Sequence, residues 1–232
     1  MAGTHGSFGA KDLAGCELFT GLTPCALDHV FRAGRVRDFP RHMTVFSQGG
    51  RAERAHVVLR GRVRITQGDP HGGLLVIRFI GPGETFGTLG LYTNHIYPAT
   101  AVSVTEVVEM SWSEADLGAL IAAYPGIAIN LVRIAGQRLH EAQERLRELA
   151  TQRVAHRIAH VLLRLAVQAG DTSDKGTSIS FPIGRKDVAE MCGATLHTVS
   201  RTFRAWEKAG LLSTSRQQII VSDLERLKRL TS

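Results

Sequence analysis

Between residues 128 and 149, small and apolar side chains recur at alternating intervals of four and three residues. They are Ala128, Val132, Ala135, Leu139, Ala142, Leu146 and Leu149. A repeat of about 3.5 residues is narrower than the stripe of a helix packed on its own core, and it is typical of a two-helix seam. No proline occurs between Pro125 and Pro182. The spacing predicts one long helix that pairs with a second copy, and an internal amphipathic helix is the alternative.

The segment before this helix is rich in turn-forming residues. Of 24 Gly and 7 Pro, 17 Gly and 5 Pro lie within residues 1–120. Short apolar runs stand between them, and Val108–Trp112 alternates apolar and polar side chains as a half-buried strand does. Short strands that begin about 8–12 residues apart favour a sandwich or barrel over a parallel sheet. Two short helices should precede the strands, one capped by Asp12 and the other by Thr23.

The net charge of the chain is uneven along its length. The whole chain has 28 Lys+Arg and 21 Asp+Glu, a balance of +7. Residues 1–150 hold 15 and 14, a balance of +1, and residues 151–232 hold 13 and 7, a balance of +6. A basic segment joined to a near-neutral one predicts a polyanion-binding module. A solvated basic surface is the alternative.

The last third of the chain has the pattern of a small helical module with a hairpin. Helices are expected at Val154–Ala169, Arg185–Cys192, Leu196–Ala209 and Ser222–Leu230, the last with Ser222 as its N-cap. A polar loop is expected at Gly170–Thr177, a short strand at Ile179–Ile183, and a hairpin from Leu211–Ser213 and Ile219–Val221.

One spacing within this module is typical of two helices joined by a tight turn. Ala189, Gly193 and Val199 stand at offsets of zero, four and ten residues. A small residue lets two helices approach, glycine allows the tight turn between them, and a β-branched residue faces inward from the second helix. The spacing predicts a helix-turn-helix over Arg185–Gly210, with the following hairpin as a wing.

The N-terminal end of a recognition helix reaches base edges in the major groove. Arg201 suits bidentate contact with guanine. Arg185, Lys186 and Thr198 are placed for phosphates. The expected DNA-binding residues are Arg185, Lys186, Thr195, Leu196, His197, Thr198, Ser200, Arg201, Arg204 and, at the tip of the wing, Arg216.

These features resemble the CRP/FNR superfamily of bacterial transcription regulators over nearly the whole chain. The matching stretches are Leu18-Phe19, Gly21-Leu22, Val45-Phe46, Gln48-Gly49, Leu59 with Gly61, Val63-Arg64, Gly81-Pro82-Gly83-Glu84, Phe86-Gly87 and Thr198-Val199-Ser200-Arg201. The resemblance implies an α+β fold. Its parts would be a cyclic-nucleotide-binding-like β-roll (residues 12–124), a dimerisation helix (residues 125–152) and a winged helix-turn-helix (residues 153–232).

The resemblance also implies a homodimer on a two-fold-related DNA site and contact with RNA polymerase. The three scattered cysteines, with no CxxC pair, indicate a reducing cytoplasm. The dimer interface would consist of Val132, Ala135, Leu139, Ala142, Leu146 and Leu149. An effector would bias the long helices between two arrangements, as an allosteric sensor requires. That the chain is an activator is an expectation only, and the choice between activator and repressor stays open, as do the operator and the regulated genes.

The chain departs from the members that bind cyclic AMP. Those carry Gly-Glu-Leu and then Arg-Ser, where this sequence has Gly87-Thr88-Leu89 and Pro98-Ala99, and Ala142 replaces a hydroxyl on the long helix. A buried phosphate without a cation is costly, so cyclic AMP is not expected as the effector. The expected effector pocket comprises Phe86, Gly87, Thr88, Leu89, Tyr97, Pro98, Ala99, Thr100, Arg138, Leu139 and Ala142.

The effector itself stays open. The segment Tyr92–Ala101 resembles the nitrogen-oxide-responsive branch of the family, which implies haem as a candidate cofactor. His95, His140, or the pair His156 and His160 could ligate a metal, and structural histidines are the alternative. The three cysteines, Cys16, Cys25 and Cys192, form no cluster, which argues against an iron–sulfur centre.

Other classes of protein fit the sequence less well. It contains no P-loop, GxGxxG, HExxH or nucleophile motif, so an enzyme is not expected. No signal peptide and no run of about 18 apolar residues is present, so no membrane contact is expected. The alternatives are a sensory module acting through protein partners and an effector-independent DNA-binding regulator.

Overall fold

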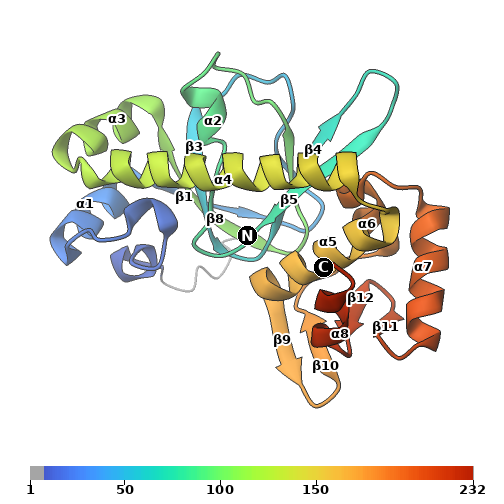
Figure 1. The fold of residues 1–232 in the computed structure, drawn as a ribbon. Coiled ribbons are helices and arrows are strands. Elements are labelled where there is room, and N and C mark those ends of the chain that lie inside the picture. Colours follow the sequence, from blue (N-terminus) through green and yellow to red (C-terminus); the bar gives the residue numbers. More distant parts are fainter. Residues whose placement is uncertain (1–7, 232) are drawn as a thin grey trace. The chain divides into compact units, whose positions relative to one another are not determined.

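The fold of residues 8–231 is described from a computed structural model (Figure 1). The chain divides into two compact units. The first comprises Met1–Ile65 and Phe79–His140, and the second comprises Thr66–Arg78 and Glu141–Ser232. The long helix α4 (Gly126–Thr151) is continuous and contributes residues to both.

Three short helices open the first unit. They are η1 (Ala10–Leu13), η2 (Glu17–Phe19) and α1 (Pro24–Ala33). Thr23 Oγ1 accepts a hydrogen bond from Ala26 N at 3.3 Å, as expected of the N-cap of α1. The expectation for Asp12 was wrong. Its carboxylate accepts from the backbone N–H of Gly9 at 2.7 Å, so Asp12 lies inside η1 and Gly9 is the cap.

The strands that follow form two four-stranded sheets, with the orders β1-β8-β3-β6 and β2-β7-β4-β5. The strands are β1 (Arg35–Phe39), β2 (Thr44–Phe46), β3 (Arg54–Arg60), β4 (Val63–Gly68), β5 (Leu74–Ile80), β6 (Thr85–Phe86), β7 (Thr100–Ser103) and β8 (Val107–Ser113). A single turn of helix, α2 (Thr88–Leu91), follows β6, and α3 (Glu114–Ala123) follows β8. This is the β-rich architecture that the turn residues predicted.

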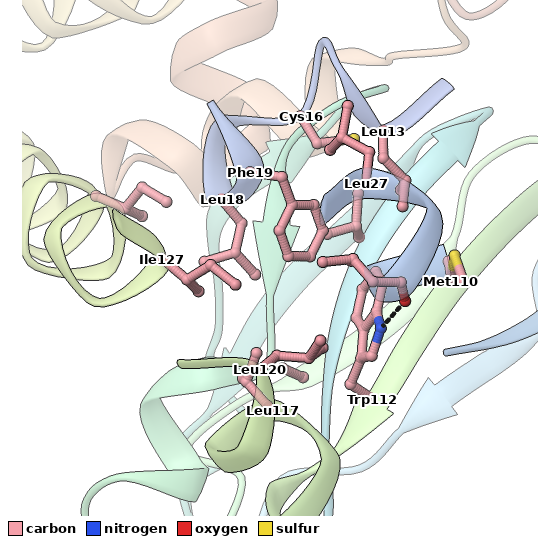
Figure 2. Packing of buried hydrophobic residues seen from close by; sticks show 14 of the residues in the cluster. Leu13, Cys16, Leu18, Phe19, Leu27, Met110, Trp112, Leu117, Leu120 and Ile127 are labelled. Carbon is pink, nitrogen blue, oxygen red and sulfur yellow. Dashed lines mark hydrogen bonds between the residues drawn. The ribbon is translucent and has the colours of Figure 1, made fainter. Parts of the chain in front are cut away.

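Aromatic and aliphatic side chains from the helices and from β8 form the main core of this unit (Figure 2). Trp112 is fully buried, and its indole Nε1 donates to Val30 O at 2.8 Å. Phe19 meets the Trp112 ring edge-on at a centroid distance of 4.9 Å. Ile127 of α4 belongs to the same cluster, so the core fixes the start of the long helix.

Two different faces of α4 have different surroundings. Ile127, Asn130 and Ile134 are buried. Asn130 Nδ2 donates to Leu18 O at 3.0 Å and to Thr20 O at 2.9 Å, which satisfies its buried amide. The heptad residues Val132 and Leu146 are 73% and 68% exposed. The heptad stripe is therefore not the face that packs on the chain's own core.

The second unit is a helical module with one antiparallel sheet of order β11-β12-β10-β9. Its elements after α4 are α5 (Val154–Ala169), β9 (Gly170–Ser173), β10 (Gly176–Ile179), α6 (Arg185–Cys192), α7 (Leu196–Lys208), β11 (Leu212–Ser215), β12 (Gln218–Val221) and α8 (Leu224–Arg229). The expected helix and hairpin positions agree with these bounds within one or two residues, except at three places.

Two of these places depend on strand pairing, and the third is a local difference in the helix cap. Gly170–Thr177 is not a loop, because it forms most of a hairpin in which Thr177 pairs with Thr172 and with Val221 of β12. The strand expected at Ile179–Ile183 ends at Ile179 for the same reason. The last helix is capped by Asp223, not Ser222, because the Asp223 carboxylate accepts from Arg226 N at 2.8 Å.

Within residues 8–231, no single helix is both long and apolar enough to cross a membrane. The pair α3 and α4, bent by 115° at their junction, reaches that length and apolarity only when the two helices are taken together.

Candidate nucleic-acid interface and effector pocket

A tight turn joins α6 to α7. Gly193 ends α6 in the left-handed conformation, with φ at 60°, and Ala194 N donates to Ala189 O at 3.0 Å. Val199 is fully buried and Ala189 is nearly so. The two helices therefore pack through the small and β-branched residues of the motif, and the expected helix-turn-helix is present.

The recognition helix α7 has one buried face and one open face. Val199, Phe203 and Trp206 pack inward. Thr195 caps the helix, because its Oγ1 accepts from Thr198 N at 3.2 Å. The side chains on the open face are Thr195, Leu196, His197, Arg201 and Arg204, while Thr198 and Ser200 are partly buried beside them. Most of the expected base-reading set thus lies on one exposed surface.

Arg185, which the sequence assigns to a phosphate contact, has partners within the module. Its Nη2 lies 3.0 Å from Glu207 Oε1 and 2.9 Å from Thr214 Oγ1. Its guanidinium also lies over the Phe203 ring, 5.7 Å from the centroid. Arg185 therefore connects α6, α7 and β11 through its Nη2 nitrogen.

The remaining basic residues of the expected set are more open. Lys186 Nζ lies 3.7 Å from Glu190 Oε1, but the lysine side chain is 76% exposed. Arg216 is exposed in the turn between β11 and β12, beside Gln217, which adopts a positive φ of 56°. The tip of the wing thus presents a cation to solvent.

The pair His156 and His160 lies at a salt-bridged junction of α4 with α5. Glu148 is buried, and its Oε1 is 2.6 Å from Arg164 Nη1 and 3.5 Å from His160 Nδ1. Burial lowers the pKa of His160, and the nearby Glu148 carboxylate opposes that shift. Among residues 8–231, no three His, Cys, Asp or Glu side chains converge as a metal site would require.

The interior of the β-roll is filled by stacked rings beneath α2. The Phe46 and Tyr97 rings stack at 3.8 Å between centroids, and His56 stacks on Phe86 at 4.9 Å. His56 Nδ1 also hydrogen-bonds the buried carboxylate of Glu109, and its Nε2 lies 3.2 Å from Tyr97 Oη. Phe86 and Tyr97, expected in an effector pocket, are thus buried among these rings.

A separate cavity of about 680 Å³ lies beside α2, α3 and α4 of the first unit. Its eleven lining residues are Thr88, Leu89, Tyr92, Ile121, Ala128, Leu131, Val132, Ile134, Ala135, Arg138 and Leu139. Nearly all of them present alkyl or aryl groups. The cavity therefore has the character of a small-molecule site with few polar contacts.

Four of the expected pocket residues line this cavity, namely Thr88, Leu89, Arg138 and Leu139. The others are not part of its lining. Gly87 forms a positive-φ turn of 77°, and a side chain there would meet His56 at 2.8 Å. The lining residues that the sequence did not assign to a pocket are Tyr92, Ile121 of α3 and five residues of α4, where apolar spacing does not distinguish a pocket wall from a core or dimer face.

Arg138 is the charged member of the lining, and it is already paired. Its Nη2 lies 2.7 Å from Glu17 Oε1 and donates to Thr85 O at 2.9 Å. Glu17 Oε1 also accepts from Thr85 N at 2.8 Å. The cavity therefore offers a guanidinium whose charge is balanced by a fixed carboxylate.

Haem needs an axial ligand for its iron from the protein. The lining contains no His, Cys or Met. Tyr92 is the one side chain of a type that can ligate haem iron, and burial, followed by the nearby Glu114 carboxylate, raises the pKa of its phenol. A higher pKa disfavours the phenolate that would bind iron. His95 lies 3.6 Å from Glu114 and outside the lining, so the cavity does not fit haem.

Two family models match the sequence of this chain. Residues 36–124 match a cyclic nucleotide-binding domain, and residues 156–230 match a Crp-like helix-turn-helix domain. Together they cover the β-roll and the module that holds α6 and α7.

Individual proteins are similar over most of the chain. A cyclic AMP receptor protein of Thermus thermophilus is 30% identical over 200 residues, which are 86% of this chain and 89% of the relative. A CRP-like cAMP-activated global transcriptional regulator of Mycobacterium tuberculosis is 28% identical over 217 residues, 94% of this chain and 97% of the relative. The structure of FixK2 from Bradyrhizobium japonicum has a TM-score of 0.76 at 20% identity, covering 86% and 98% of the two chains. The expected fold class is confirmed.

Proposed function

The chain belongs to the CRP/FNR family of transcription regulators, and from this premise we propose that it acts as a homodimer that binds specific DNA sites through α7. The observation that carries the proposal is that α7 has one buried face and one exposed, basic face. Val199 and Phe203 are buried in the module, while Arg201 and Arg204 are exposed on the other face. A helix so divided can enter the major groove without loss of its own packing.

The residues of this surface have distinct roles in the proposal. Arg201 reads guanine, since a guanidinium can donate two parallel hydrogen bonds to O6 and N7. Lys186 and Arg216 contact phosphates on either side of the groove. Arg185 positions α7 against the wing through Glu207 rather than binding DNA itself. The remaining members of the DNA-facing set are Thr195, Leu196, His197, Thr198, Ser200 and Arg204.

The second copy of the chain would pair along the heptad face of α4. Val132, Leu139, Leu146 and Leu149 are between 49% and 73% exposed in the single chain. Alternate small residues, Ala135 and Ala142 among them, let two helices approach closely. Two paired helices would place two recognition helices on one two-fold-related DNA site.

Control by an effector other than cyclic AMP is part of the proposal. The relatives are named for cyclic AMP, whereas this chain has Thr88 and Pro98 where the resemblance places the carboxylate and the arginine of the nucleotide site. Calorimetric titration with cyclic AMP should show no binding at micromolar concentrations, and a saturable micromolar isotherm would contradict this part. Haem is left out of the proposal because the lining lacks a suitable ligand. RNA polymerase in the cytoplasm is the natural protein partner of such a regulator.

Arg201→Ala tests the DNA-binding function directly. A preferred site is first selected from random DNA with the wild-type protein, and affinities are then measured by fluorescence anisotropy. Loss of a bidentate guanine contact costs about 1–3 kcal/mol, so affinity for the selected site should fall by about tenfold or more, and affinity for random DNA should fall much less. Arg229→Ala, at an exposed arginine of α8, is the control and should change neither value. Equal losses on both DNAs would contradict the role of Arg201.

A further inference from the structure

We propose that the cavity beside α2, α3 and α4 is the effector site and that its ligand is an uncharged, largely apolar small molecule. This inference rests on the proposed function, because the ligand would be the effector that controls DNA binding. The volume of about 680 Å³ lies within the range typical of small-molecule sites. The eleven lining residues define the ligand class by their chemistry.

The lining offers few polar contacts. Besides Arg138, the side-chain polar groups are the hydroxyls of Thr88 and Tyr92. Aliphatic side chains such as Ile121, Leu131 and Ile134 provide most of the remaining wall. Binding to such a surface is stabilised by the removal of apolar ligand area from water. The lining can hydrogen-bond at most one or two hydroxyl or carbonyl groups of the ligand.

The ion pair between Arg138 and Glu17 disfavours anionic ligands. Glu17 Oε1 lies 2.7 Å from Arg138 Nη2, and the same oxygen accepts from Thr85 N. A ligand carboxylate or phosphate would face this fixed carboxylate and would have to compete for a guanidinium already engaged. The free-energy cost of desolvating the anion would not be offset by its contacts in the cavity, so a neutral ligand is favoured.

The occupant is a small molecule rather than the second copy's helix. Val132, Ala135 and Leu139 belong both to the lining and to the heptad face. Only four of the eleven lining residues lie on the heptad face, and the other seven, from α2 to α4, would remain as the wall of a ligand site beside a two-helix seam. A ligand there would touch the residues through which two copies meet, and this gives it a direct route to the arrangement of the dimer.

A pair of matched probes tests the ligand class. N-phenylnaphthylamine is neutral, and anilinonaphthalene sulfonate has nearly the same rings plus one negative charge. Both fluoresce more strongly in apolar surroundings. The full-length protein should bind the neutral probe saturably, with one probe per chain and about tenfold greater affinity than the sulfonate. Sulfonate binding as tight as that of the neutral probe, or a titration that does not saturate, would overturn the proposal.

Two substitutions place the probe in the cavity. Thr88→Trp fills it from α2 and should abolish binding of the neutral probe. Ile96→Trp, at a half-exposed residue outside the lining, is the matched control and should leave binding unchanged. Glu17→Gln keeps an oxygen acceptor but removes the charge, so the sulfonate should gain several-fold in affinity. An unchanged sulfonate affinity would contradict the role given to the Glu17–Arg138 pair.

Binding of selected DNA by the same protein samples separates this inference from the function on which it rests. Loss of probe binding with intact DNA binding would overturn the inference alone. Probe binding with no selected DNA site would overturn the regulator function and leave a ligand-binding protein.

Discussion

Arg185 and Glu207 form an ion pair, 3.0 Å between Nη2 and Oε1, that joins the first helix of the helix-turn-helix to the end of the recognition helix. Thr214 of the wing completes the contact, because its hydroxyl lies 2.9 Å from the same nitrogen. Three elements that must keep a fixed geometry on DNA thus share one guanidinium. The contact explains why an arginine at the start of α6 need not face a phosphate.

Arg185→Ala should lower affinity for the selected DNA site and destabilise the module by about 1–2 kcal/mol, because a charge-assisted contact is lost. The salt dependence of DNA binding should keep its slope, since no phosphate contact is removed. Lys186→Ala is the contrasting variant, and it should lower the slope of log K against log salt by about one. A slope change as large in Arg185→Ala would restore the phosphate role.

Leu146→Glu should convert the protein from dimer to monomer. Leu146 is 68% exposed in the single chain, so the substitution leaves the chain's own core intact and places two like charges opposite each other in the seam. Light scattering after size-exclusion chromatography measures the mass. Val167→Glu, at an 86% exposed apolar residue of α5, serves as the control and should remain dimeric. A dimeric Leu146→Glu protein would show that α4 is not the interface.

Gly193→Ala should destabilise the second unit by about 1–2 kcal/mol. Its φ is 60°, and a Cβ there would lie 3.1 Å from Leu149 Cδ2. Gly118→Ala is the matched control, since α3 leaves open space around that position and alanine is the better helix former. Chemical denaturation should show opposite signs for the two variants, and a neutral Gly193→Ala would argue against a strained turn.

Acidification should weaken the second unit through His160. Burial lowers the pKa of this imidazole in the folded chain below its usual value of 6.5, so the unfolded chain binds the proton first as the pH falls. The stability that depends on neutral His160 is complete above that value and declines as the pH drops toward the folded pKa. The groups that face the ring are Glu148 and Arg164, with Arg147 and His156 nearby.

The measurement is the melting temperature between about pH 7.5 and pH 5.5, the interval in which histidine usually titrates. His160→Gln should show a smaller decrease on acidification than the wild-type protein. His71→Gln, at an exposed histidine, should follow the wild-type curve. Parallel curves for wild type and His160→Gln would remove His160 from the acid response.

Features that depend on local spacing could be predicted from the sequence, and features that depend on distant partners could not. The heptad of α4 and the Ala189, Gly193 and Val199 spacing depend only on helical periodicity. The hairpin of β9 and β10 was missed because its Thr and Ser become strand residues only by pairing, β9 with β10 and β10 with the distant β12.

The candidate site divides in the same way. The DNA-facing side of α7 follows from its amphipathic pattern. The pairing of Arg138 with Glu17 joins residues 121 positions apart, so no local signal could reveal it. The same holds for Arg185 and Glu207. The sequence does not reveal the carboxylate partner of either arginine. It therefore assigned Arg185 to phosphate and Arg138 to an effector.

The two faces of α4 separate fold from association along one helix. Ile127, Asn130 and Ile134 are buried in the chain's own structure, whereas the large heptad side chains are exposed in the single chain. In the proposed dimer, the amount of regulator in the cell therefore becomes a signal in its own right. Where most chains are single, doubling the dosage would raise the concentration of DNA-competent pairs about fourfold, by mass action.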